Sequence, residues 1–233
     1  MELRVGGALT ALGHMSTWLV LMIPLIVGVA VAGSLAVDRR HNYIPLILAR
    51  GISRWQYFVV KALSMATAAM MAVLISCLLF LCMTALFAPF GNTIQFPGFG
   101  RSETGERIPR PPSYPGPLPQ LARTAPFWND VVAIGFLMLA GAALAMVGVV
   151  VSTFIANEYL ALILPFAAVI GGIYVLRGPL EILQPVVYLE LWSTYPRTVP
   201  SALLGYAAPL YWGVIGLLLF VVGSMVFLLR EPE

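Results

Sequence analysis

The chain has 233 residues, of which 60% are hydrophobic and only 10% are charged, whereas an ordinary soluble domain has about 25% charged residues. So little polar surface cannot cover so apolar a core in water, and the composition therefore excludes a soluble enzyme. The net charge of +3 is small, and no basic stripe indicates nucleic acid, so we expect no nucleic-acid partner. The sequence instead predicts an all-α fold, a polytopic membrane helix bundle that occupies residues 1–233 as a single transmembrane domain.

Five apolar stretches are long enough, or nearly so, to cross a hydrocarbon core, which takes about 20 residues of helix. They are continuously apolar rather than alternating, which favours helices over barrel strands. Tryptophan and tyrosine mark several of their ends, as expected for side chains that prefer the headgroup level. The predicted spans are residues 18–37, 58–88, 131–155, 159–176 and 210–229.

Small residues recur at four-residue spacing in two of these spans. Gly28, Ala32 and Ala36 form one stripe, and Gly141 and Ala145 form another. This spacing lets helix backbones approach closely. We interpret both stripes as helix-packing positions, although such pairs also arise by chance in helices rich in Gly and Ala.

The loop of residues 38–57 is basic, and its charges lie close to span ends. Arg39, Arg40, Arg54 and Lys61 are such charges, and basic residues at these places favour the cytoplasmic side. We therefore expect this loop and the C-terminus to be cytoplasmic and the N-terminus to lie outside. An odd number of spans follows, so either that arrangement is real or a preceding span is absent from this chain.

Inside this loop the sequence predicts a short interfacial helix over residues 44–50. Pro45 is tolerated in a first turn. Gly51 is the expected left-handed residue after the helix, with Ile52 packing back on Ile47. A flat helix with arginines at its end suits docking to another protein, or it is an amphipathic linker that rests on lipid.

The next helix has a clear start signal. Ser53 and Gln56 have the spacing of a capping box, so the helix should begin at Arg54 and run into the membrane. Lys61 is the one charged residue within the predicted spans, and we expect it to snorkel to the interface.

Two longer connectors lie on the opposite side. Residues 89–127 contain nine prolines, which exclude helix from most of this loop. Residues 178–206 are mixed in composition, with a short interfacial helix possible over 180–191. The Pro-rich outer loop either caps a pathway, meets an extracytoplasmic partner or is a solvated spacer.

The sequence lacks the motifs of an enzyme or a pump. It has no P-loop, no HExxH and no GxSxG motif. Cys77 and Cys82 lie in one apolar span without metal-ligand spacing. The spans also lack the carboxylates of proton relays. We expect no cofactor, no metal and no catalytic residue, and any ATP would be hydrolysed by a partner.

Between the first two spans the chain carries, in order, an acidic-basic cluster, an apolar stretch ending in arginine, a Ser-Arg pair, an aromatic residue and a lysine: Asp38-Arg39-Arg40, residues 46–50, Ser53-Arg54, Tyr57 and Lys61. This order resembles the permease subunits of type-2 ABC transporters, in which such a cluster precedes the pattern LL-x-R-P-x-S-R. The resemblance covers residues 19–69 by motif and most of the chain by layout. Gly51 stands where that family commonly has proline.

The resemblance implies that two permease subunits, identical or different, form a pathway in the cell membrane and that two ATPase subunits bind below them. A helix between the family's second and third spans docks on the ATPase. The family usually has six spans, and this sequence resembles it from the second onward. By position, the residues that would couple to the ATPase are Arg39, Arg40, Ile44, Leu46, Ile47, Leu48, Arg50, Ser53 and Arg54.

The leading hypothesis is therefore a permease subunit of an ATP-driven exporter, surrounded by membrane lipid. The alternative is a non-transporting accessory or scaffold subunit of a larger membrane complex. A secondary transporter or channel is disfavoured by the uncharged spans and by the absence of a visible internal repeat. Binding of an ATPase by residues 38–57 would separate the first two hypotheses.

Overall fold

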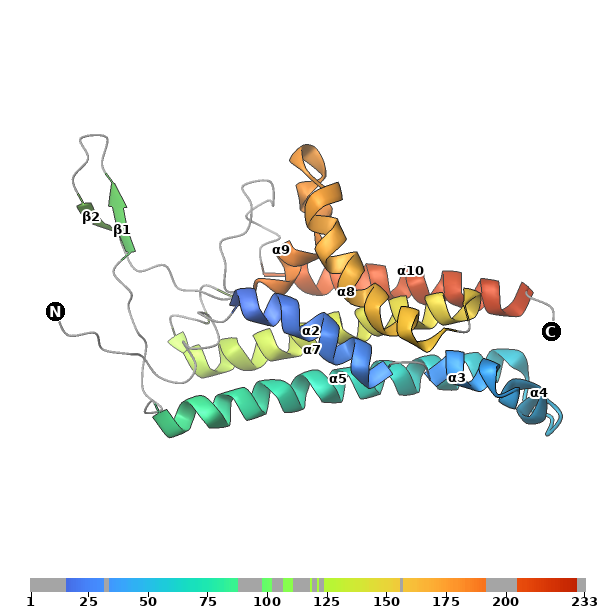
Figure 1. Cartoon of the computed structure of the whole chain (residues 1–233). Helices are drawn as coiled ribbons and strands as arrows, with labels where there is room; N and C mark the ends of the chain where they lie inside the picture. The colour runs from blue at the N-terminus through green and yellow to red at the C-terminus, as the bar shows by residue number, and fades with distance from the viewer. Residues whose placement is uncertain are drawn as a thin grey trace.

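The computed structural model describes residues 16–31, 34–87, 98–101, 107–110, 118, 121, 124–155, 157–191 and 205–229. These residues form long helices, several short ones and one small sheet (Figure 1). The long helices are α2 (Ser16–Val31), α5 (Arg54–Phe87), α7 (Pro126–Phe154), α8 (Glu158–Val175) and α10 (Ala207–Leu229). The short elements are α3 (Ser34–Arg40), α4 (Tyr43–Leu48), the 3-10 helix η1 (Gly178–Leu183), α9 (Pro185–Leu189) and the strands β1 (Gly98–Arg101) and β2 (Arg107–Arg110).

Within the part of the chain that the structure describes, five stretches are long and apolar enough to cross a membrane: Val20–Arg40, Arg54–Met83, Phe127–Phe154, Glu158–Val175 and Ala207–Leu229. They overlap the five predicted spans, and the predicted all-α polytopic bundle is confirmed. The helix α7 starts at Pro126, before the predicted residue 131. Proline suits the first helical turn because its fixed φ fits the helix and its missing N–H is not needed there.

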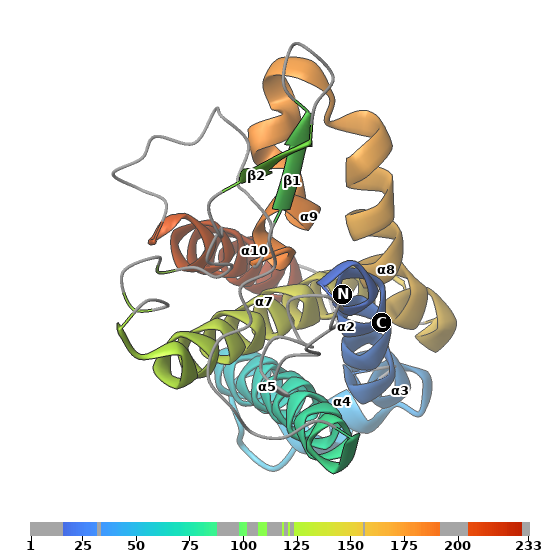
Figure 2. The same cartoon turned by 90° about the vertical axis from the view of Figure 1, so that its left-hand side faces the viewer.

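The helix α7 is the centre of the bundle. It contacts α2, α3, α5, α8 and α10, and Leu137, Ala140 and Val149 on it are buried. The helices α5, α8 and α10 lie around it and expose much of their apolar surface, as expected for helices that face lipid. Seen from the end, α8 leans away from the other long helices (Figure 2).

The bundle has two distinct ends. At one of them, which we name the α4 end, lie α3, α4, the start of α5, the turn between α7 and α8, and the end of α10 (Figure 1). The other end holds the end of α5, the start of α7 and the β1–β2 hairpin. This alternation agrees with the predicted connectivity, in which the loop of residues 38–57 and the end of the last span share one side.

The Pro-rich loop contains a hairpin that the sequence analysis did not predict. The strands β1 and β2 pair antiparallel, with Gly98 opposite Arg110 and Phe99 opposite Pro109. A proline is tolerated here because each strand of a two-stranded sheet is an edge strand.

The connector between α8 and α10 contains two short helices, η1 and α9, instead of the one helix suggested over residues 180–191. Pro185 begins the second, since a proline favours a helix start over a helix interior. The hydroxyls of Tyr188 and Tyr211 donate to the carbonyl oxygens of Ile182 and Leu183 at 2.7 and 2.8 Å, and their rings stack with centroids 4.0 Å apart. These contacts fasten the connector to the start of α10.

The small residues singled out in the sequence lie at close helix contacts. A Cβ on Gly28 would collide with the backbone carbonyl of Leu162, so α2 and α8 meet there almost backbone to backbone. A Cβ on Gly141 would lie 2.9 Å from Cγ2 of Val73 on α5. Ala36 and Ala145 are fully buried, and Ala32 lies outside the described residues. These contacts are made within one chain.

We predict that Gly28→Ala destabilises the protein by about 1–3 kcal/mol, the usual result of overpacking a tight contact. The matched control is Gly171→Ala in α8, where an added Cβ meets nothing within 4 Å. Thermal unfolding of the detergent-purified protein measures both. Equal midpoints for the two variants would contradict the close approach of α2 and α8.

Candidate functional site

The helix α4 is bounded on each side by a residue with left-handed backbone. Asn42 has φ 55° before it and Gly51 has φ 88° after it. Asparagine tolerates this region and glycine adopts it freely. The Gly51 amide donates to the carbonyl of Leu48 at 3.0 Å, which confirms the predicted glycine ending. The chain therefore turns sharply at both ends of α4.

The packing of Ile52 on Ile47 stays a prediction. Ile52 is 42% exposed, and Ile47 is partly buried against the core of the bundle. The helix also begins and ends slightly earlier than the predicted residues 44–50. Because the bundle supplies a larger apolar surface than one isoleucine does, Ile47 turns toward the bundle.

The predicted capping box between α4 and α5 is confirmed. The Gln56 amide donates to Oγ of Ser53 at 3.2 Å, and the Ser53 amide donates to Oε1 of Gln56 at 3.1 Å. Two amide groups at the start of α5 are thereby satisfied, and α5 begins at Arg54 as predicted. The place at which α4 ends and the long span begins is thus set locally.

The two sides of α4 differ in what they contact. Ile44 and Ile47 are partly buried against the core. Tyr43 and Leu46 are 49% and 62% exposed, and Arg50 is exposed. Tyr43 and Leu46 have the i, i+3 spacing of one helical face, and Arg50 lies in the turn that follows the helix. We name Tyr43, Leu46 and Arg50 the α4 surface.

Ile52 and Trp55, at 42% and 46% exposed, extend the apolar exposure along the chain beyond α4. Trp55 also makes an edge contact with Phe220 of α10, with ring centroids 6.0 Å apart.

Asp38, at the end of α3, binds two residues of α5. Its Oδ2 accepts a hydrogen bond from the Tyr57 hydroxyl at 2.6 Å and forms an ion pair with Nζ of Lys61 at 2.5 Å. The side chains of Lys61 and Asp38 are only 21% and 18% exposed. A carboxylate therefore compensates the charge of Lys61 in place, and the snorkelling of Lys61 to the interface stays a prediction.

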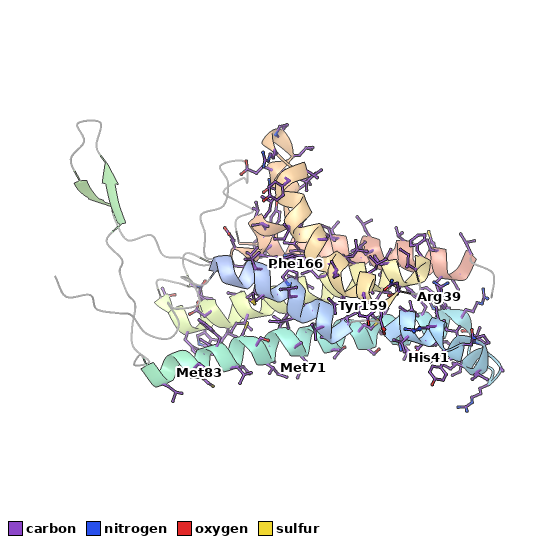
Figure 3. All side chains as sticks on the ribbon, viewed as in Figure 1. Arg39, His41, Met71, Met83, Tyr159 and Phe166 are labelled. Atoms are coloured by element: carbon purple, nitrogen blue, oxygen red, sulfur yellow. The ribbon has the colours of Figure 1, made fainter. Side chains whose placement is uncertain are left out.

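Arg39 binds the end of α7. Its Nη1 donates to the backbone carbonyl oxygens of Ser152 and Thr153 at 3.1 and 2.9 Å. The last carbonyls of a helix lack partners within the helix, and a cation there also stabilises the negative end of the helix dipole. Ser152 and Thr153 are themselves buried, so this contact closes the end of the central helix. Figure 3 shows Arg39 at the α4 end.

Arg40 reaches a third helix. Its Nη1 lies 3.4 Å from Oε1 of Glu158, the first residue of α8, and its side chain is 64% exposed. An exposed pair of this length contributes less than about 1 kcal/mol. The pair matters for its position and not for its strength, because it joins the end of α3 to the turn between α7 and α8.

Three consecutive residues thus connect α3 to three different helices. Asp38 binds α5, Arg39 binds α7 and Arg40 binds α8. We name these three residues the DRR joint. Of the sequence-predicted docking residues, Arg39, Arg40, Ile44 and Ile47 make contacts inside the chain. Leu46 and Arg50 face outward, Ser53 caps α5, and Leu48 and Arg54 are intermediate in exposure.

Aromatic rings attach α10 to the start of α5. Phe58 packs against Phe220 and Phe227 with centroids 5.7 and 5.4 Å apart, and Tyr57 stacks on Phe227 at 5.9 Å. Gly223 makes room for Phe58, since a Cβ there would lie 3.2 Å from its ring. This cluster could not be predicted from the sequence, where Tyr57 stands out at a span end and in the motif, because its ring partners lie far along the chain. Within the described residues, no group of three or more His, Cys, Asp or Glu residues could hold a metal ion.

Comparison with protein families gives one match. A family model described as a protein of unknown function, DUF2705, matches residues 5–193, which include the DRR joint and α4. Neither the curated proteins nor the solved structures gave a match.

We predict that Asp38→Asn lowers the unfolding free energy by about 1–3 kcal/mol, because it leaves the charge of Lys61 poorly compensated in a mostly buried place. The double variant Asp38→Asn with Lys61→Met should be more stable than Asp38→Asn alone. Tyr57→Phe is the milder control, since it removes one hydrogen bond and keeps the ion pair. Thermal unfolding of the purified variants tests the order, and a double variant less stable than the single one would contradict the pairing.

Proposed function

The chain belongs to the DUF2705 family of proteins of unknown function, and we propose that it is the membrane-spanning permease subunit of an ATP-driven ABC exporter. A second permease subunit would complete the pathway, and a separate ATPase subunit would dock on the α4 surface. The observation that carries the proposal is an exposed apolar face on a short helix that already packs its other side on the bundle.

The two-sided character of α4 favours a protein partner over lipid. An amphipathic helix that rests on lipid buries its one apolar face in the acyl region. In α4 the face formed by Ile44 and Ile47 is used inside the chain, and Tyr43 and Leu46 form a second apolar face. A helix that is apolar on two sides is expected to be buried on two sides.

The charge of this segment indicates what the partner surface contains. Arg50 follows Leu46 by four residues in the chain, and both are exposed. We expect a groove with an apolar floor for Leu46 and Tyr43 and an acidic residue for Arg50. Opposite charges at the rim of such a contact set orientation and rate of association, while the central apolar side chains supply most of the affinity.

In this proposal a partner hydrolyses the ATP. The sequence contains no GxxxxGK[ST] motif, the P-loop with which a chain would hold the phosphates. The resemblance of residues 38–61 to type-2 ABC permeases supplies the class of the partner. The apolar spans fit a substrate path between two bundles.

We predict that an ATP-hydrolysing subunit copurifies with the chain from its native membrane in mild detergent. Leu46→Asp with Arg50→Glu should reduce its recovery by about tenfold or more, since the change removes an apolar anchor and reverses the neighbouring charge. The matched control is Arg177→Glu, an exposed arginine after α8 and away from the α4 end. Recovery is measured by quantitative mass spectrometry together with the ATPase activity of the complex. If wild type brings down no nucleotide-hydrolysing subunit, the accessory-scaffold hypothesis replaces the proposal.

We also predict that the α4 end faces the cytoplasm. In a background with Cys77→Ala and Cys82→Ala, Ala49→Cys should react with a membrane-impermeant maleimide only after the cells are opened. Glu181→Cys in η1, which follows the opposite end of α8, should react in intact cells. Both positions are exposed, so access to each depends on the side of the membrane. Labelling of Ala49→Cys in intact cells would overturn the orientation and, with it, the docking of a cytoplasmic ATPase.

A further inference from the structure

We infer that the DRR joint passes movement of α4 directly to the end of the central helix α7, with Arg39 as the positioning residue. The inference rests on the proposed function for the source of the movement, which is the docked ATPase. The coupling between α4 and α7 needs no partner, because each contact that forms it joins described residues of this chain.

The connection between the joint and α4 is short and well bonded. Only His41 and Asn42 separate α3 from α4. The Asn42 amide donates to the carbonyl of Arg39 at 3.1 Å, and the His41 amide donates to the carbonyl of Val37 at 3.0 Å. The His41 ring also lies 3.0 Å from that Val37 carbonyl and stacks on Tyr43, with centroids 5.7 Å apart. A displaced α4 therefore moves the end of α3 with it.

Arg39 is the member of the joint with the best geometry for transmission. Its one Nη1 group bridges two successive carbonyls in the last turn of α7, those of the buried residues Ser152 and Thr153. By contrast, Arg40 meets Glu158 at 3.4 Å in an exposed place, where solvent screens the attraction. Asp38 holds the other side of the joint to α5 through Tyr57.

The helices α10 and α8 pack so closely against α7 that a displacement of its end should also displace them. A Cβ on Gly223 would lie 3.1 Å from Cγ2 of Val150, and one on Gly216 would lie 3.4 Å from Cβ of Ala143, so α10 packs closely along α7. A Cβ on Gly148 would lie 3.4 Å from the carbonyl of Ala161 in α8. Closely packed interiors transmit displacement rather than absorb it, so the neighbours of α7 should follow its end.

The test is a double-mutant cycle on the full chain in lipid nanodiscs, without any partner. Ile47→Ala loosens the packing of α4 against the core. Hydrogen–deuterium exchange is then measured at residues 151–155, the last turn of α7, in the wild-type and Arg39→Gln backgrounds. We expect Ile47→Ala to raise exchange there by about threefold in the wild-type background and by much less with Arg39→Gln.

Two comparisons keep the result specific. Arg39→Lys, which retains a cation that can reach a carbonyl, should restore most of the effect. Arg50→Gln is the matched control, an exposed arginine of the same loop outside the joint, and it should leave the effect of Ile47→Ala unchanged. If Ile47→Ala does not alter residues 151–155 in the wild-type background, or alters them equally with Arg39→Gln, the inference is overturned.

This experiment separates the inference from the proposed function. Exchange in the isolated chain does not depend on an ATPase, so a failed copurification would remove the source of movement and leave the measured coupling standing. Conversely, if an ATPase binds but the exchange experiment finds no coupling through Arg39, the permease proposal stands and the inference about the DRR joint is overturned. In a complex that does copurify, Arg39→Gln should keep the ATPase bound and lose its dependence on the permease.

Discussion

The bond from the Arg39 guanidinium to the carbonyls of Ser152 and Thr153 is the contact on which the α4 end depends. A helix that ends near a membrane surface leaves carbonyl groups without partners, and in a dry surrounding each of these is costly. Many membrane helices leave them to water or lipid headgroups. Here a side chain from another span meets them, so the position of α3 and the end of α7 are fixed by one interaction.

The residues on either side of Arg39 extend this solution to the neighbouring helices. Asp38 compensates Lys61 at 2.5 Å inside the span of α5, and Arg40 reaches Glu158 on α8. Charged residues within or beside spans are tolerated when they pair. Because the three side chains are consecutive, pairing all of them also brings α5, α7 and α8 together around the end of α3. The same residues thus satisfy the polar groups at the membrane boundary and hold the helices of the bundle together.

The sequence allowed those features to be predicted that depend on local chemistry. The spans follow from length and apolarity, and the Ser53–Gln56 capping box and the left-handed Gly51 follow from signals a few residues apart. The partners of Lys61 and Arg39 could not be found in this way, because they lie on other helices. The β1–β2 hairpin was also missed. The prolines of this loop argue only against a helix, and the pairing of two strands depends on both partners at once.

Under the proposed function, the inward use of these charges limits what a docking partner would recognise. The sequence suggests a strongly basic loop, but Arg39 and Lys61 are bonded within the bundle and Arg40 is paired with Glu158. The exposed residues of the α4 surface are Arg50, Tyr43 and Leu46. Recognition should therefore rest on apolar fit with one guiding charge, and salt should weaken it only modestly, because screening acts on the charged part of a contact and leaves apolar burial intact. A loop whose charged side chains are paired within the chain is better suited to transmitting a movement than to attracting a partner from a distance.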